Sequence, residues 1–288
     1  MFAIVTMILM ETARPDKGME ARPFLRWVGG KRWLVPYLSE LVGDMKFGAY
    51  HEPFLGGGAA FLGLNPQGKS FLADLNPELV ETYIGVRDDP EAVAQVLKRH
   101  KNVRDYYYDL RESRPRLPAT KAARFIFLNH TSYNGVFRVN RDGKYNVPFG
   151  HRRWVNIPTQ GDLLAVSRRL LDATIRVADF GSCIDDVAEG DLVFLDPPYT
   201  VAHNNNGFVH YNRRLFSWED QARLSRLIDQ IRSRGAFYIL TNAAHSSIVK
   251  LFDKGDWCVE TNRKNAIGGA QASRGTATEL LFTNLDRP

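Results

Sequence analysis

The chain has 288 residues, of which 44% are hydrophobic and 24% are charged, and its formal net charge is +6. This is the composition of a globular protein long enough for a full core and two lobes, and it excludes a low-complexity chain. The two cysteines, Cys183 and Cys258, are far apart and have no metal-ligand spacing around them. We therefore expect a reduced, cytoplasmic protein without disulfides and without a metal.

The N-terminal segment is predicted to lie outside the fold. Its first ten residues are apolar, but they lack a basic leader and are too short to span a bilayer, so no membrane partner is expected. We predict that residues 1–21 form a flexible lead-in. Residues 24–31 then indicate the opening of a first helix.

The next segment has the pattern of half a nucleotide-binding α/β unit. A short strand over residues 50–54 runs into three glycines (56–58), a helix follows, and a strand over residues 70–73 ends at Asp74. Glycines let a backbone approach a ligand closely, and an acid at the end of the next strand commonly holds ribose hydroxyls. The glycines are not spaced G-x-G-x-x-G and no G-K-[ST] follows, which disfavours a dinucleotide site and an ATP P-loop.

Residues 78–165 interrupt this alternation and predict an inserted, mainly helical lobe. Helical stretches are expected at residues 78–99, 104–113 and 118–130, before a basic, aromatic-rich loop. Residues 98–160 carry 14 Lys and Arg against 4 Asp and Glu, a local charge of 14 − 4 = +10, which leaves −4 for the rest. A basic segment in a slightly acidic protein is typical of a polyanion partner, and the interleaved aromatic residues favour nucleic acid. A solvated basic face is the simpler alternative.

The alternating pattern returns after the insert, so one catalytic domain is predicted over residues 22–77 and 166–288. The polar residues 200–214 predict a mobile loop. A crossover helix is predicted at residues 218–234. Further strands are predicted at residues 175–178, 192–195, 236–240, 257–261 and 279–283.

The most informative residues are Asp196-Pro197-Pro198-Tyr199, which directly follow the strand at 192–195. The two prolines stiffen the turn and remove two N–H donors, so carbonyl and carboxylate oxygens remain as acceptors. A tyrosine face beside such acceptors suits a flat ring with an exocyclic NH2 group, as in adenine or cytosine. The alternative is a Pro-Pro turn that Asp196 merely caps, and the four residues alone do not decide.

Six short elements in a fixed order carry a family resemblance. They are WxGGK at 27–31, EPFxGGG at 52–58, AD-N at 73–76, YNGxxRxN at 133–140, YNVPFG at 145–150 and DPPY at 196–199; SRG at 273–275 also looks like the family's ending. The set resembles the Dam-type (D12 class) DNA adenine-N6 methyltransferases, especially the GATC-modifying, DpnM-like enzymes of restriction systems. The resemblance implies a Rossmann-like, S-adenosylmethionine-dependent α/β sheet with an inserted, mainly helical DNA-recognition lobe. Double-stranded DNA is the implied partner, with the enzyme a monomer or weak dimer.

The resemblance also implies the site residues. The catalytic residues would be Asp196, Pro197, Pro198 and Tyr199. The cofactor would contact Trp27, Lys31, Phe54, Gly56, Gly57, Gly58, Asp74, Asp179, Phe180 and Asp196, with Lys31 near its carboxylate. The DNA would contact Arg26, Tyr133, Asn134, Arg138 and Pro148. Tyr133 would wedge into the base stack and Arg138 would read a guanine.

Three alternatives remain open from the sequence. A methyltransferase for cytosine N4 or for a protein side-chain amide commonly has S-P-P-Y or N-P-P-Y, so Asp196 favours adenine, and the basic insert favours DNA over protein. A catalytically silent DNA-binding regulator would keep the fold, but the intact cofactor and catalytic motifs argue against it. A nicotinamide-dependent oxidoreductase is the third competitor.

Overall fold

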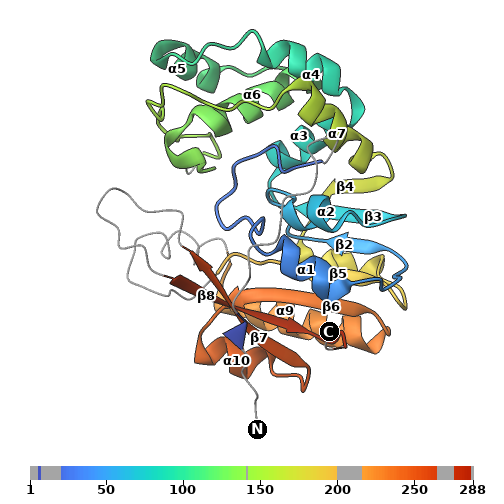
Figure 1. The fold of residues 1–288 in the computed structure, drawn as a ribbon. Helices are drawn as coiled ribbons and strands as arrows, with labels where there is room; N and C mark the ends of the chain where they lie inside the picture. Colours follow the sequence, from blue (N-terminus) through green and yellow to red (C-terminus); the bar gives the residue numbers. More distant parts are fainter. Residues whose placement is uncertain (1–5, 8–20, 141, 200–215, 265–275, 287–288) are drawn as a thin grey trace.

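A mostly parallel, eight-stranded sheet organises the computed structural model, which describes residues 6–7, 21–140, 142–199, 216–264 and 276–286 (Figure 1). The strand order is β1-β7-β8-β6-β5-β2-β3-β4, and β8 alone runs antiparallel to its two neighbours, β6 and β7. The strands are β1 (Thr6–Met7), β2 (Tyr50–Glu52), β3 (Ser70–Asp74), β4 (Ala173–Val177), β5 (Leu192–Leu195), β6 (Phe237–Ala243), β7 (Trp257–Lys264) and β8 (Thr276–Thr283). The predicted α/β class with a Rossmann-like sheet is confirmed.

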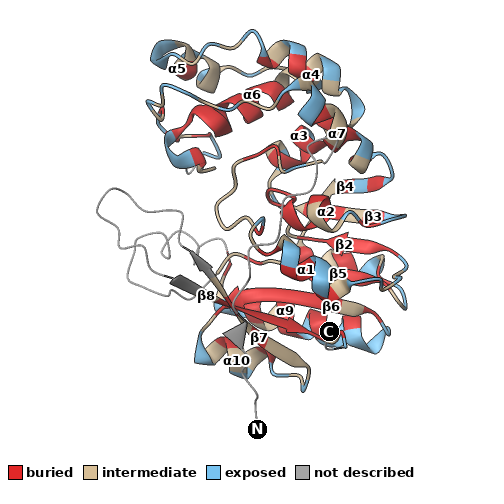
Figure 2. Ribbon diagram, in the orientation of Figure 1, coloured by how far each residue is buried: buried red, intermediate tan, exposed pale blue. Residues whose placement is uncertain are grey.

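Helices cover both faces of the sheet, which explains why its central strands are buried along almost their whole length (Figure 2). On β5, Leu192 and Phe194 enter the core shared with α1 (Val35–Val42) and α2 (Ala59–Leu64). The alternate residues, Val193 and Leu195, enter a second core. That core is shared with the 3-10 helix η2 (Phe180–Asp185), α9 (Trp218–Ser233) and α10 (Ser246–Phe252).

The winding of the sheet reverses between β2 and β5. From β2 the chain proceeds outward to β3 and β4, whereas from β5 it proceeds the other way to β6. The carboxyl ends of β2 and β5 therefore lie side by side at a topological switch point. Open α/β sheets bind their ligands at such a point.

The insert adds a stack of helices beyond the β4 edge of the sheet (Figure 1). They are α3 (Pro77–Asp88), α4 (Pro90–Leu97), α5 (Arg104–Glu112), α6 (Pro118–Thr131) and α7 (Gln160–Leu170). The expected stretch at 78–99 is two helices, because Asp89 ends α3, and its side chain then caps α4 by accepting from the Ala92 N–H. The core of these helices is continuous with that of the sheet. The proposed boundaries at 78 and 165 fall inside α3 and α7.

Two local expectations differ from the structure. Residues 24–31 form loop and turns rather than the opening of a helix, and α1 begins only at Val35, after Gly29 has adopted a left-handed φ of 80°. The lead-in was expected to lack structure, but Thr6–Met7 forms β1 and pairs in parallel with Glu260 and Thr261 of β7. The predicted loop at 200–214 and the SRG element at 273–275 lie outside the described residues.

Candidate active site

Asp196 follows β5 directly and lies at the carboxyl edge of the sheet. The pairing of Leu195 with Leu240 places Thr241 of β6 beside it, and the Thr241 hydroxyl donates to Asp196 Oδ1 at 2.6 Å. The Lys31 ammonium contacts the same oxygen at 2.6 Å. Burial raises the pKa of Asp196, while Lys31 and Thr241 oppose that rise. The carboxylate is therefore fixed by two partners and still partly open, with 18% of its side chain exposed.

Lys31 and Tyr199 complete a compact network around this carboxylate. The Lys31 side chain is only 3% exposed and also donates to the Gly29 carbonyl at 3.0 Å. Its ammonium lies 3.6 Å from Glu279 Oε2 and 4.9 Å from the centre of the Tyr199 ring. The Tyr199 hydroxyl donates to the same Glu279 oxygen at 2.6 Å. A lysine predicted to lie beside the cofactor's carboxylate is thus paired with Asp196, the predicted catalytic aspartate.

The glycine turn after β2 is closed by Trp27 on one side and Asp74 on the other. A Cβ at Gly56 would lie 2.6 Å from the Trp27 indole nitrogen, and one at Gly57 would lie 2.9 Å from Trp27 Cβ. Asp74 Oδ2 accepts from the Gly56 N–H at 3.0 Å. Gly58 starts α2 with a left-handed φ of 63°, where a Cβ would meet the Tyr83 hydroxyl. Glycine is required here for conformation as well as space.

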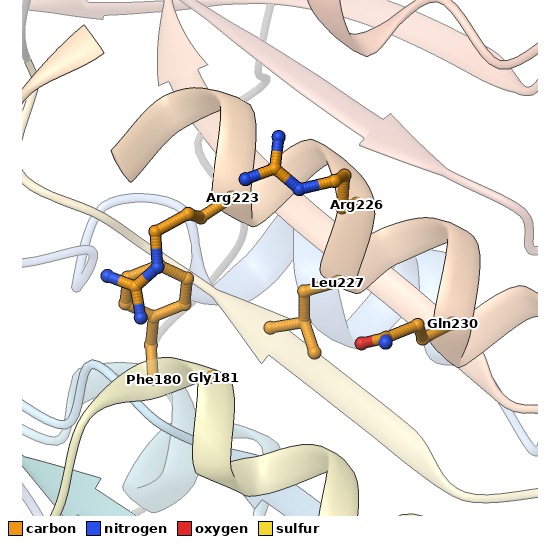
Figure 3. A pocket seen from close by; sticks show the side chains of 6 residues that line it. All are labelled: Phe180, Gly181, Arg223, Arg226, Leu227 and Gln230. Atoms are coloured by element: carbon orange, nitrogen blue, oxygen red, sulfur yellow. The ribbon is translucent and has the colours of Figure 1, made fainter. Parts of the chain in front are cut away.

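Two aromatic residues and an acid lie at the neighbouring strand ends. Phe54 stacks on Phe180 with ring centroids 5.2 Å apart. Asp179 Oδ1 accepts from the Gly181 N–H at 2.9 Å and from Arg223 of α9 at 2.6 Å. The Arg223 guanidinium also lies over the Phe180 ring (Figure 3).

The cavity in Figure 3 does not contain the predicted catalytic residues. It encloses about 280 Å³ between η2 and α9 and is lined by Phe180, Gly181, Arg223, Arg226, Leu227 and Gln230. It shares Phe180 with the predicted cofactor residues but includes none of Asp74, Asp196 or Tyr199. The predicted catalytic residues therefore lie at the carboxyl edge of the sheet and not in this cavity.

Four of the five predicted DNA contacts, all except Arg26, lie in one loop, here called the recognition loop (residues 132–150, with 141 outside the described residues). The Tyr133 N–H donates to the Pro148 carbonyl at 2.8 Å, and Tyr133 itself is 58% exposed. Asn134 adopts a left-handed φ of 56°. Arg138 Nε donates to Asn146 Oδ1 at 2.9 Å, which orients an otherwise exposed guanidinium.

Arg26 is tied to this loop through Asn129 at the end of α6. The Asn129 side chain accepts from the Arg26 N–H and donates to the Arg26 carbonyl, both at 2.8 Å. It also donates to the Gly135 carbonyl at 3.3 Å. Next in the chain, Trp27 stacks on Phe137 of the loop with ring centroids 6.1 Å apart. The structure thus joins the WxGGK element to the recognition loop.

Comparison with known proteins identifies the chain. Residues 27–266 match the family described as D12 class N6 adenine-specific DNA methyltransferase. A type II methyltransferase, M1.LlaDCHI of Lactococcus lactis subsp. cremoris, is 34% identical over 274 residues, covering 91% of this chain and 95% of its own. The chain belongs to the D12 class of adenine-specific DNA methyltransferases.

Two further relatives share less sequence identity with this methyltransferase. The type II methyltransferase M.MjaIII of Methanocaldococcus jannaschii is 31% identical over 78% of this chain and 85% of its own. The DNA adenine methylase of Escherichia coli K12 is 28% identical over 77% of this chain and 80% of its own. Family membership makes the protein an S-adenosylmethionine-dependent enzyme that acts on DNA adenine.

The residues at the carboxyl edge fit that cofactor. The glycine turn leaves a backbone with no Cβ beside Trp27, and the acids Asp74 and Asp196 offer negative charge to a ligand that carries an ammonium and a sulfonium. When bound, S-adenosylmethionine supplies an electrophilic methyl group. Among the described residues no cluster of three metal-ligating side chains occurs. No helix in the described part of the chain combines the length and hydropathy needed to cross a bilayer.

Several residues of the site carried no sequence signal of their own. Thr241 and Asn146 become visible only through strand and loop pairing. Asn129 could have been suspected, because it is a polar residue in the apolar run of α6. Glu279 is likewise an acid directly before the apolar run of β8, where a residue that is only 2% exposed would be expected to be apolar.

Glu52, the acid of the EPFxGGG element, is the last residue of β2 and is almost fully buried. Its Oε2 accepts from the Tyr50 hydroxyl at 2.8 Å and from the Phe61 N–H at 3.0 Å. Burial raises its pKa to about 8, with smaller contributions from the charges of Asp196 and Asp74. Glu52 is therefore protonated in the folded protein at neutral pH, whereas it is ionised in the unfolded chain.

We expect Glu52→Gln to weaken the pH dependence of stability. Between the unfolded pKa near 4.5 and the folded value of about 8, the folded protein holds a proton that the unfolded chain has released. This stabilisation is complete below the lower value and is lost as pH rises, by about 1.4 kcal/mol per pH unit. Glutamine keeps the acceptor for Tyr50 and Phe61 but cannot ionise. The free energy of unfolding of both proteins, measured with urea from pH 5 to 8, should fall more steeply with pH in the parent than in Glu52→Gln. The same pH dependence in both proteins would show that Glu52 does not titrate in this way.

Proposed function

We propose that this methyltransferase modifies N6 of a flipped adenine within GATC in double-stranded DNA, as a cytoplasmic enzyme that acts as a monomer or weak dimer. The observation that carries the adenine chemistry is the convergence of Lys31, Thr241 and Tyr199 around Asp196 at the switch point of the sheet. GATC rests on the likeness of the YNGxxRxN and YNVPFG elements to those of GATC-modifying enzymes. The type II methyltransferases and DNA adenine methylases among its relatives agree with a restriction-modification or Dam-like role.

Activation of the target nitrogen is the task of the DPPY turn. The N6 lone pair of adenine is delocalised into the ring, so the nitrogen is a poor nucleophile. Asp196 and the Pro197 carbonyl accept its two hydrogens, which favours a tetrahedral nitrogen, and Pro198 keeps the turn rigid. Tyr199 would stack on the ring and hold the N6 lone pair in line with the methyl group that S-adenosylmethionine supplies. The neutral thioether would leave as the N–C bond forms, and one N6 hydrogen would be lost as a proton. Orientation of this kind contributes several kcal/mol, about 7 to 11 at best.

The cofactor would lie along the ends of β2, β3 and β4. Asp74 would accept from its ribose hydroxyls, and Trp27 with Gly56, Gly57 and Gly58 would line its tail. Phe54, Asp179 and Phe180 would flank its adenine. Contact between Lys31 and the cofactor's carboxylate would require an exchange of partners, since this ammonium is engaged by Asp196.

The recognition loop would extract the base and read its neighbours. A base inside a duplex must be flipped, which costs a few kcal/mol. The exposed Tyr133 is suited to fill the vacated stack, and Asn134 and Pro148 flank it. Arg138, oriented by Asn146, would donate to O6 and N7 of a guanine. Arg26 would contact DNA beside this turn.

Arg138→Ala is expected to relax sequence choice. Loss of a bidentate arginine–guanine contact costs about 1 to 3 kcal/mol of discrimination, equivalent to roughly 5- to 150-fold in the ratio of kcat/KM for GATC over sites with a changed guanine. The control is Lys144→Ala, an exposed lysine of the same loop. Lys144→Ala should lower kcat/KM by the same factor on all duplexes, as loss of a phosphate contact does. A uniform loss in Arg138→Ala as well would make Arg138 a phosphate contact.

Sequencing of methylated plasmid DNA tests the proposed function. The protein is expressed in a host without DNA adenine methylation, and modified bases are mapped at single-nucleotide resolution. N6-methyladenine confined to GATC on both strands is the expected result. N6-methyladenine in another motif would overturn the proposed specificity, and modified cytosine would overturn the target base.

A further inference from the structure

Glu279 is a buried acid at the catalytic edge of the sheet that the proposed mechanism does not use. It lies near the amino end of β8, opposite Ala243 at the end of β6 and Thr261 of β7. Because β8 runs antiparallel to β6, this position lies at the same edge as Asp196. A carboxylate that is 2% exposed in a central strand is costly unless its charge is matched.

Two groups of the proposed site satisfy this carboxylate through one oxygen. The Tyr199 hydroxyl donates to Glu279 Oε2 at 2.6 Å, and the Lys31 ammonium lies 3.6 Å from it. Lys31 is closer to Asp196, at 2.6 Å. One cation is therefore shared by two carboxylates, and the tyrosine of the DPPY turn is anchored at its far end.

We propose that Glu279 is a positioning residue for methyl transfer, which fixes the ring of Tyr199 and draws part of the Lys31 charge away from Asp196. The inference rests on the proposed roles of Tyr199 and Asp196. A phenol held at its hydroxyl has a fixed ring plane, so a stacked adenine presents N6 to Asp196 in one orientation. A lysine shared with Glu279 leaves Asp196 a better acceptor for the N6 hydrogens than an exclusive ion pair would.

A double-mutant cycle with Glu279→Gln and Tyr199→Phe tests this role. Glutamine keeps an acceptor oxygen but removes the charge, and phenylalanine keeps the stacking ring but removes the hydroxyl. We expect each single change to lower kcat about 10-fold, with KM for DNA changed less than about threefold. The kcat of the double variant should lie within about threefold of that of the less active single variant, because both changes break the same Tyr199–Glu279 hydrogen bond.

Additive losses, near 100-fold in the double variant, would overturn the proposal, as would an unchanged kcat in Glu279→Gln. If Glu279→Gln does not fold, Tyr199→Phe alone decides, since it leaves every charge in place: an unchanged kcat would overturn the anchoring role. The parent enzyme is assayed in parallel. If the parent enzyme does not methylate DNA, the proposed function is rejected. If the parent is active and the losses of kcat in the two single variants are additive, only the proposed role of Glu279 is rejected.

A matched control uses a bond of the same kind away from the site. The Tyr238 hydroxyl donates to Asp256 Oδ2 at 2.8 Å, and Arg232 pairs with that carboxylate. Asp256→Asn and Tyr238→Phe should lower the melting temperature but leave kcat unchanged. If they lower kcat as much as the changes at Glu279 and Tyr199, the effect is merely structural and the proposal fails.

Discussion

Asp196→Ala is expected to lower kcat by roughly 10²- to 10³-fold, the usual cost of removing one fixed electrostatic contact to a developing charge. The carboxylate is the proposed acceptor for N6, and its Oδ1 is held by Thr241 and Lys31. Affinity for S-adenosylmethionine, measured by calorimetry, should remain largely intact. Radiolabelled methyl transfer to duplex DNA gives kcat.

Thr241→Val is the control for this change. It removes the hydrogen bond to Asp196 Oδ1 but keeps the carboxylate and nearly the same volume. We expect a loss of about 10-fold or less, because Lys31 still holds the oxygen. If Asp196→Ala retained a tenth of the parent's turnover, the carboxylate would not be the group that activates the nitrogen.

Lys31→Met is the second change with a large expected effect, and it acts on stability and on pH dependence together. Removing one partner of a buried ion pair costs about 3 to 5 kcal/mol, because Asp196 and Glu279 lose their shared cation. Lys31 lowers the pKa of Asp196, so its loss raises that pKa further. The acid limb of the kcat profile should therefore move to higher pH.

The sign of the stability change follows from the same shift. A folded carboxyl with a raised pKa stabilises the fold while it is protonated, and this stabilisation is lost as pH rises through the folded pKa. The deficit of Lys31→Met, measured by urea unfolding, should thus be larger at pH 8 than at pH 5. Lys254→Met removes an ion pair with the half-exposed Asp229 and should cost less than about 1 kcal/mol. Equal deficits in both variants would contradict the proposed network.

The alternation of strands and helices made the sheet predictable. β2, β3 and β5 are short, mostly buried strands that end in polar or glycine-rich turns, and each lies where the pattern indicated. The start of α1 was not predictable, because Gly29 delays it by a left-handed turn. The pairing of β1 with β7 joins residues more than 250 positions apart, and no local pattern indicates such a contact.

The site was predictable where chemistry is carried by a contiguous motif. Asp196 and Tyr199 follow β5, the glycine turn follows β2, and four of the predicted DNA contacts share the recognition loop, each at the position of its motif. The partners that set the charge of the site come from distant strands, as with Thr241 and Glu279, and their side-chain types are common. Only the sheet order brings them to Asp196, which is why the sequence predicted the carboxylate but not its electrostatic setting.

The central claim is transfer of a methyl group to N6 of adenine under the control of Asp196. Incubation of duplex DNA with S-adenosylmethionine carrying a deuterated methyl group, followed by digestion and mass spectrometry of the nucleosides, tests it directly. The label should appear in N6-methyldeoxyadenosine with the parent protein and accumulate roughly 10²- to 10³-fold more slowly with Asp196→Ala. Label in a methylated cytosine, or equal labelling of adenine by both proteins, would contradict the account.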